Sequence, residues 1–205
     1  SPDANTPGQA SITVDVPQGQ NRANYYVHGV EGQAGVLPLT VSAPGFVANS
    51  ADMTVVQPAF DLVGLSTTTT TLTVDDPFYV RVGVPNGQAT ALSINQAIRA
   101  GGQPLTATIV SSAPTVADLV TLPDSPSPVD LTIQPGQLNT PTSVANGGVA
   151  LEPLTAGVTT VSATIPGLIQ TSNASWDVTV SAPDIFISGT TVGAGLQYGN
   201  FAATL

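Results

Sequence analysis

Residues 161–168 read VSATIPGL, an alternating segment that ends in a Pro-Gly turn. Val161, Ala163 and Ile165 recur at every second position, so on an extended strand they share one face while the hydroxyls between them share the other. One apolar face opposite one polar face is typical of an antiparallel sheet that is buried on one side only. Pro-Gly dipeptides mark chain reversals. This stretch therefore predicts a strand and a turn of an all-β fold.

Most other apolar segments show the same period of two. Strands are predicted over residues 11–16, 78–84, 105–109, 129–133 and 176–180. Trp176 is in phase with Val178 and Val180, which predicts that its side chain lies in the core. We find no convincing amphipathic helix, because the best candidate, residues 93–99, is short and runs into a Gly-Gly pair.

Composition excludes several classes of function. Only 8% of the 205 residues are charged, and the net charge is -10, because 13 acidic residues face three arginines and no lysine. Such a chain has no positive surface for a phosphate backbone, and an anionic membrane surface repels it. The absence of cysteine removes disulfides and thiolate-bound metals, and no apolar run is long enough to span a membrane. We therefore expect no nucleic-acid partner and no membrane insertion, whereas the acidic balance permits divalent cations.

The sequence repeats itself. Residues 39–46, LTVSAPGF, match residues 161–168 at an offset of 122 positions, and in both copies a polar patch, a second strand and a proline follow. Upstream, residues 12–20 match 129–137. Downstream, residues 64–68 match 188–192. Repeats of this length indicate an array of similar domains rather than a single irregular one.

The repeat frame predicts three segments. Residues 1–57 form the C-terminal part of one domain, residues 58–182 form a complete domain, and residues 183–205 form the N-terminal strands of the next. Because the 205 residues begin and end inside predicted domains, we expect them to be part of a longer array of repeats.

Residues 12–57 resemble the bacterial immunoglobulin-like (Big) repeats of large surface and secreted proteins. The resemblance lies in a strand followed by Pro-Gln-Gly-Gln at 17–20, an alternating strand at 23–30, a strand ending in Ala-Pro-Gly-Phe at 43–46, and a final strand. The second copy departs from this pattern over residues 139–152. The resemblance implies tandem immunoglobulin-like antiparallel β-sandwiches that act as an extracellular or cell-surface spacer, stalk or adhesin segment. The partners it implies are neighbouring copies or repeats, and cell-surface glycans or proteins if the segment is adhesive.

Few residues could carry chemistry. His28 is the only histidine, and no Gly-x-Ser-x-Gly nucleophile elbow accompanies it, so we expect a surface histidine and no enzyme activity. The better candidates are carboxylates at predicted domain junctions and strand ends, where carboxylate and carbonyl oxygens can bind calcium. The candidate calcium ligands are Asp61, Asp75, Asp76 and Asp184. Solvated carboxylates with no metal are the alternative.

A run of five threonines at 67–71 predicts an edge or surface strand, since β-branched side chains suit a pleated surface. O-glycosylation, or a threonine ladder that faces ice or sugar, is the alternative for this run. The expected function is thus a non-catalytic structural segment of a surface protein, stalk or filament. Two alternatives stay open: a glycan- or calcium-binding β-sandwich module, and an accessory domain of a secreted hydrolase.

Overall fold

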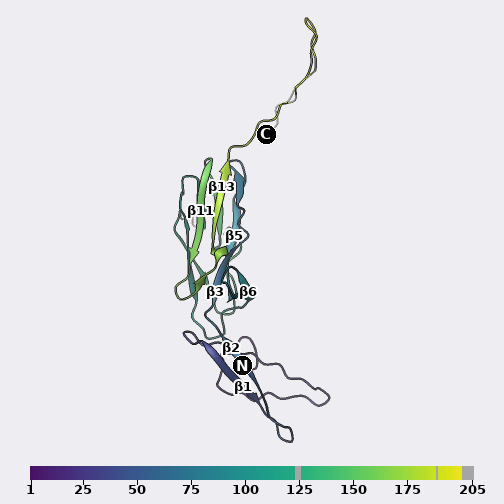
Figure 1. Cartoon of the computed structure of the whole chain (residues 1–205), viewed down its shortest axis with the longest axis vertical. Helices are drawn as coiled ribbons and strands as arrows, with labels where there is room; N and C mark the ends of the chain where they lie inside the picture. Colours follow the sequence, from purple (N-terminus) through teal and green to yellow (C-terminus); the bar gives the residue numbers. More distant parts are fainter. Residues whose placement is uncertain (123–125, 188, 200–205) are drawn as a thin grey trace.

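The computed structural model describes residues 1–122, 126–187 and 189–199, and most of its regular structure is β-strand. The described part contains no helix with the length and apolar character of a membrane span. A hairpin, a two-layered central body and an extended C-terminal segment follow one another along the long axis (Figure 1). The strands are β1 (Gly35–Val41), β2 (Asn49–Val55), β3 (Ala59–Val63), β4 (Thr68–Thr70), β5 (Asp76–Pro85), β6 (Leu92–Asn95), β7 (Leu105–Ser111), β8 (Ala117–Val120), β9 (Val129–Ile133), β10 (Val149–Pro153), β11 (Gly157–Thr164), β12 (Ile169–Gln170) and β13 (Ser175–Ser181), and two short 3-10 turns are η1 (Val144–Asn146) and η2 (Ser172–Ala174).

One layer of the central body has the strand order β12-β3-β5-β10-β8, with β6 also paired to β5. Its pairs are antiparallel except for β12 with β3. Phe78, Val80 and Val82 of β5 are buried at alternate positions, as a strand that covers a core on one side requires.

The second layer has the order β4-β13-β11-β7-β9. Its pairs are antiparallel except for β4 with β13, in which Thr68 lies beside Thr179 and Thr70 beside Ser181. Since β4 directly follows β3 in the chain, the first segment of the body contributes a strand to each layer. The threonine run thus forms an edge strand, as predicted.

The two layers share one hydrophobic core, so the central body is a β-sandwich. Burial of each large aliphatic or aromatic side chain stabilises such a core by about 1.5–3 kcal/mol. The core side chains from the two layers are Phe60, Leu62, Phe78, Val80, Val82, Ala107, Ile109, Ala117, Leu119, Val129, Leu131, Ile133, Val149, Leu151, Val161, Ala163, Ile165, Ala174, Val178 and Val180.

The strands predicted within the central body are confirmed as β5, β7, β9, β11 and β13. The helical candidate at 93–99 is not helical: its first residues belong to β6, which pairs with β5. The strands predicted at 11–16 and 23–30 do not form. Tyr26 exchanges a pair of backbone hydrogen bonds with Ser1, and no strand among the described residues pairs with either segment.

The prediction for Trp176 is wrong. Its side chain is 37% exposed, although Val178 and Val180 on the same strand are buried. Trp176 stands at the start of β13, just after η2, and its indole Nε1 donates a hydrogen bond to the carbonyl of Asn173 at 2.9 Å. The strand alternation is kept at Trp176, and its register partner Val161 on β11 is buried, yet the indole itself is partly exposed.

The β1–β2 hairpin and the C-terminal segment lie beyond opposite ends of the sandwich (Figure 1). Both expose apolar side chains, such as Phe46 and Val47 in the hairpin turn and Ile185, Phe186 and Ile187 in the C-terminal segment. No continuous strand forms in residues 183–187 and 189–199, and the rest of the third predicted segment, residues 188 and 200–205, lies outside the described residues.

Candidate functional site

Asp61, a predicted calcium ligand, is a buried structural carboxylate, 9% exposed on the outer side of β3. Its Oδ2 accepts a hydrogen bond from the backbone N–H of Leu92 at 3.1 Å, and its Oδ1 accepts one from the hydroxyl of Thr171. Both oxygens are therefore occupied by protein donors, which join β3 to the start of β6 and to the residue before η2.

The other three candidate ligands lie elsewhere. Asp61 is paired with Arg81, whereas Asp76 begins the same β5 strand five residues earlier, so at about 3.3 Å per residue the backbones of Asp61 and Asp76 are about 16 Å apart along the strand. Asp76 Oδ2 accepts a hydrogen bond from the backbone N–H of Ser66 at 2.7 Å. Ser66, Asp76 and Asp75 line one shallow depression of the surface. Asp184 follows β13. The structure does not assemble the four residues into one site, and residues 1–122, 126–187 and 189–199 contain no metal-binding group of three or more His, Cys, Asp or Glu side chains.

His28 is half-buried rather than a surface strand residue. Its ring lies so close to Gly8 that a Cβ there would meet His28 Cβ at 3.2 Å. Its Nδ1 is buried and has no hydrogen-bond partner among the described residues. Burial, followed by the positive charges of the N-terminal ammonium and Arg99, lowers the pKa of His28 below its usual value of 6.5. A neutral, partner-free imidazole has no orienting carboxylate and does not form a catalytic triad.

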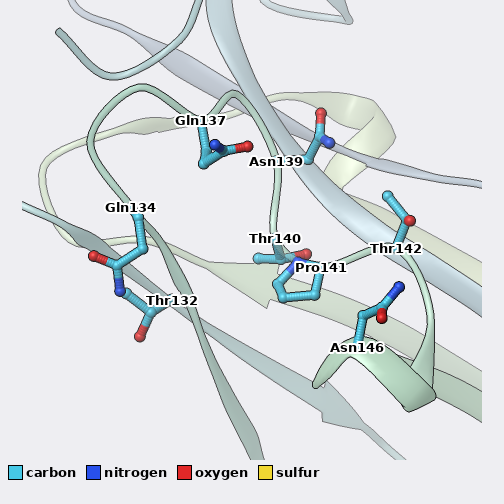
Figure 2. A pocket seen from close by; sticks show the side chains of 8 residues that line it. All are labelled: Thr132, Gln134, Gln137, Asn139, Thr140, Pro141, Thr142 and Asn146. Carbon is cyan, nitrogen blue, oxygen red and sulfur yellow. The ribbon is translucent and has the colours of Figure 1, made fainter. Parts of the chain in front are cut away.

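The sandwich has a shallow pocket of about 330 Å³ beside β9, the outermost strand of its layer (Figure 2). Its lining comes from β9 and from the loop that leads to β10, and it consists of amides and hydroxyls with one proline. The lining residues are Thr132, Gln134, Gln137, Asn139, Thr140, Pro141, Thr142 and Asn146.

Two hydrogen bonds fix the loop that lines the pocket to the neighbouring layer of the sandwich. The Thr140 hydroxyl accepts a hydrogen bond from the backbone N–H of Val80 at 3.1 Å, and the Thr140 N–H donates to the Val80 carbonyl at 3.0 Å, which ties the loop to β5. Asn139 Oδ1 is buried and has no partner in the part of the chain that the structure describes. The pocket can therefore hydrogen-bond a neutral, hydroxyl-rich ligand. Sequence analysis missed it, although residues 139–152 stood out as a departure from the repeat.

The outer side of the second layer is a face of hydroxyl groups. Along each of its strands the outward positions alternate with buried core positions, and cross-strand neighbours bring them together. Two carboxylates, Asp130 and Asp177, accept hydrogen bonds from Thr108 and Thr160 on the neighbouring strands, at 2.6 and 2.7 Å. The hydroxyl face comprises Thr68, Thr70, Thr106, Thr108, Thr132, Thr160, Ser162, Thr164, Ser175, Thr179 and Ser181, with Val110 and Val158 exposed among them.

Residues before the hairpin pack against the loop between β6 and β7. Arg99 Nη2 lies 2.5 Å from Glu31 Oε2, and this hydrogen bond lowers the pKa of the Glu31 carboxyl. Gly101 has a φ of +75°, and a Cβ at that position would lie 3.1 Å from Pro7 Cγ. After the hairpin, Gln57 Nε2 donates a hydrogen bond to the carbonyl of Gly167, in the turn between β11 and β12, at 3.1 Å. Sequence analysis predicted a boundary at residues 57 and 58 but not these contacts, because the residues in each pair are far apart in the chain.

Neither the comparison with protein-family models nor the comparison with curated proteins found a match for this sequence.

Proposed function

We propose that this chain is a non-catalytic structural segment of an extracellular surface protein, stalk or filament. The observation that carries the proposal is that the chain enters and leaves the sandwich at opposite ends (Figure 1). β3 begins at Ala59 beside the junction with the hairpin, and β13 ends at Ser181 on the far side. This in-line arrangement allows successive domains to extend a rod, as in repeat arrays in which each unit contacts only its neighbours.

The strand order supports tandem immunoglobulin-like domains as the repeating unit. The first layer, β3-β5-β10-β8, corresponds in position to strands A, B, E and D of the immunoglobulin fold, and β7-β11-β13 corresponds to C, F and G. One difference is that β9, which lies beside β7, comes after β8 in the chain. The proposed unit is therefore immunoglobulin-like in layout, with an altered connection in its middle.

The surface suits lateral contacts in a filament. The hydroxyl face carries two carboxylates and no cation, so little charge has to be desolvated when it meets a second surface. Neighbouring copies of the chain are the proposed partners.

The test is immunolabelling of intact source cells with an antibody to this chain, followed by electron microscopy of the complete gene product. We expect label on intact cells and thin rods in the micrographs. Label that appears only after permeabilisation, or a compact particle, contradicts the proposal.

The pocket beside β9 favours a second candidate function, the binding of a neutral glycan. Its amides and hydroxyls match the donors and acceptors of sugar hydroxyls. A glycan array tests this candidate by comparing the native chain with two variants at exposed residues. Gln137→Ala alters the pocket lining, and Asn95→Ala is the control outside the pocket. Binding lost only in the Gln137 variant supports it, and a flat array rejects it. No comparable observation favours calcium binding or a hydrolase accessory role.

A further inference from the structure

We propose that the end of the sandwich from which residues 183–199 leave is a docking surface for the next immunoglobulin-like repeat. This end, termed the tail end, comprises the β4–β5 loop (residues 71–75) and the β10–β11 loop (residues 154–156), and it includes the end of β13. The opposite end, termed the hairpin end, includes the β6–β7 loop (residues 96–104). The inference rests on the proposed tandem array and adds how consecutive repeats hold each other.

The hairpin end shows how a junction is made. There Glu31 of the preceding segment binds Arg99 on the β6–β7 loop, and Pro7 packs closely against Gly101, where a Cβ would lie 3.1 Å from Pro7 Cγ. Ala100 and Gly102 of the same loop are buried. The preceding segment is thus seated on the loop by an ion pair and by apolar contact.

The internal repeat maps the preceding segment onto the tail end. Gly35 and Val36, which begin β1, match Gly157 and Val158, which begin β11, at the same offset of 122 positions as the Pro-Gly turns. Glu31 lies four positions before Gly35 and Glu152 five positions before Gly157, so each copy has a carboxylate shortly before this strand, one position out of register.

The tail end has the chemistry of an uncovered interface. Leu72, Val74 and Leu154 project from its two loops with 63%, 83% and 43% of their surface exposed. The Thr71 N–H donates to the Ser181 carbonyl at 3.1 Å, so the β4–β5 loop lies beside the point where the chain leaves. β4 and β11 flank β13, so the two loops are about 10 Å apart, two strand spacings.

Charge identifies the occupant. The tail end carries Asp75, Asp76 and Glu152, and the three arginines of the sequence lie elsewhere. The hairpin end carries Arg99 on the loop that receives Glu31. An acidic, partly apolar tail end complements the hairpin end of another repeat. Residues 183–186 match residues 58–61 and residues 188–192 match residues 64–68, the opening of the sandwich, and so place such a repeat next along the chain.

The test uses an extended chain in which residues 1–182 are followed by residues 58–205, so that the native chain gains one further sandwich. Because the sequence has no cysteine, Thr106→Cys in both sandwiches allows two spin labels to be attached on the exposed hydroxyl face. Double electron–electron resonance then measures the distribution of label distances. We expect one narrow distance, and amide exchange in residues 71–75 of the first sandwich that is roughly tenfold slower than in the native chain.

The disrupting variant carries Leu72→Asp and Val74→Asp in the first sandwich, and Val110→Asp on the hydroxyl face is the matched control. All three side chains are exposed, so the sandwich is expected to fold in each case, and the thermal transition checks this. A distribution that broadens only in the Leu72/Val74 variant supports the docking surface. A broad distribution in the extended chain, or a narrow one that this variant leaves unchanged, overturns it. Neither result concerns cell-surface location, so failure of the docking surface and failure of the proposed function are distinguishable.

Discussion

Thr171 donates its hydroxyl hydrogen to Asp61 Oδ1 across 110 residues of sequence, and so closes the end of the sandwich that faces the hairpin. The other oxygen of Asp61 accepts the N–H of Leu92. One carboxylate thereby ties the start of β6 and the residue before η2 to β3.

Asp61→Ala is expected to destabilise the sandwich by about 1–3 kcal/mol, because it leaves the Leu92 N–H without its acceptor, whereas the Thr171 hydroxyl keeps the Phe60 carbonyl. Urea denaturation followed by the fluorescence of Trp176 measures the change. Asp177→Ala is the control, since that carboxylate lies on the exposed hydroxyl face and accepts from Thr160. Equal losses in the two variants contradict the structural role of Asp61.

Gly83→Ala is expected to cost about 1–3 kcal/mol, the range for forced overpacking. A Cβ at this position would meet the carbonyl oxygen of Ile94 at 2.1 Å, and that oxygen belongs to the backbone of β6 and cannot turn aside. Gly87→Ala is a matched control, because no atom lies within 4 Å of its Cβ position. A shift of the urea midpoint that is the same for both variants is the contrary result.

Arg99→Gln is expected to raise the pKa of Glu31, which the hydrogen bond from Arg99 holds below its usual value of 4.5. A lowered pKa in the folded state means that the ion pair contributes stability above about pH 4.5 and that this contribution is lost as the pH falls through the folded-state pKa. Both side chains are solvent-accessible, so the contribution is below about 1 kcal/mol. NMR titration of the Glu31 side chain checks the shift, and an unchanged pKa in Arg99→Gln contradicts the pairing.

His28 is expected to make stability fall as the pH drops below 6.5. Burial is the main cause of its lowered pKa, so the folded state resists protonation while the unfolded state accepts the proton at the usual pH. Stability is therefore highest above pH 6.5, declines as the pH falls through the folded-state pKa, and then levels off. In His28→Gln this decline should be absent. Denaturant midpoints at a series of pH values give the comparison, and a decline that persists in the variant assigns it to another group.

Local alternation predicted the strands of the sandwich correctly because each of them is hydrogen-bonded to a neighbouring strand in one of the two layers. Val129 to Ile133 alternates, and β7 lies beside it to complete the ladder. Ile12 to Val16 alternates equally well, yet no strand forms, since its backbone groups have no neighbouring ladder. Periodicity states which face a strand can bury, and pairing decides whether the strand exists.

The candidate sites were less predictable because their contacts are distant in sequence. Asp61 was expected to be a junction ligand, but its partners come from residues 31 and 110 positions away. The Glu31–Arg99 pair spans 68 positions. Neither has a signal in the residues around it. The exposure of Trp176 has no signal in the alternation either, because its register partner Val161 and its neighbours Ala174 and Val178 are all buried.

The parallel pairing of β4 with β13 has a mechanical consequence. β4 is connected through β3 to the hairpin end, and β13 leads out of the tail end, so tension along the long axis draws the two strands past each other in opposite directions. The hydrogen bonds between them are then loaded simultaneously in shear, and they do not break one at a time. The rate at which the domain gives way under a pull, rather than its equilibrium stability, decides how long such a strand pair holds.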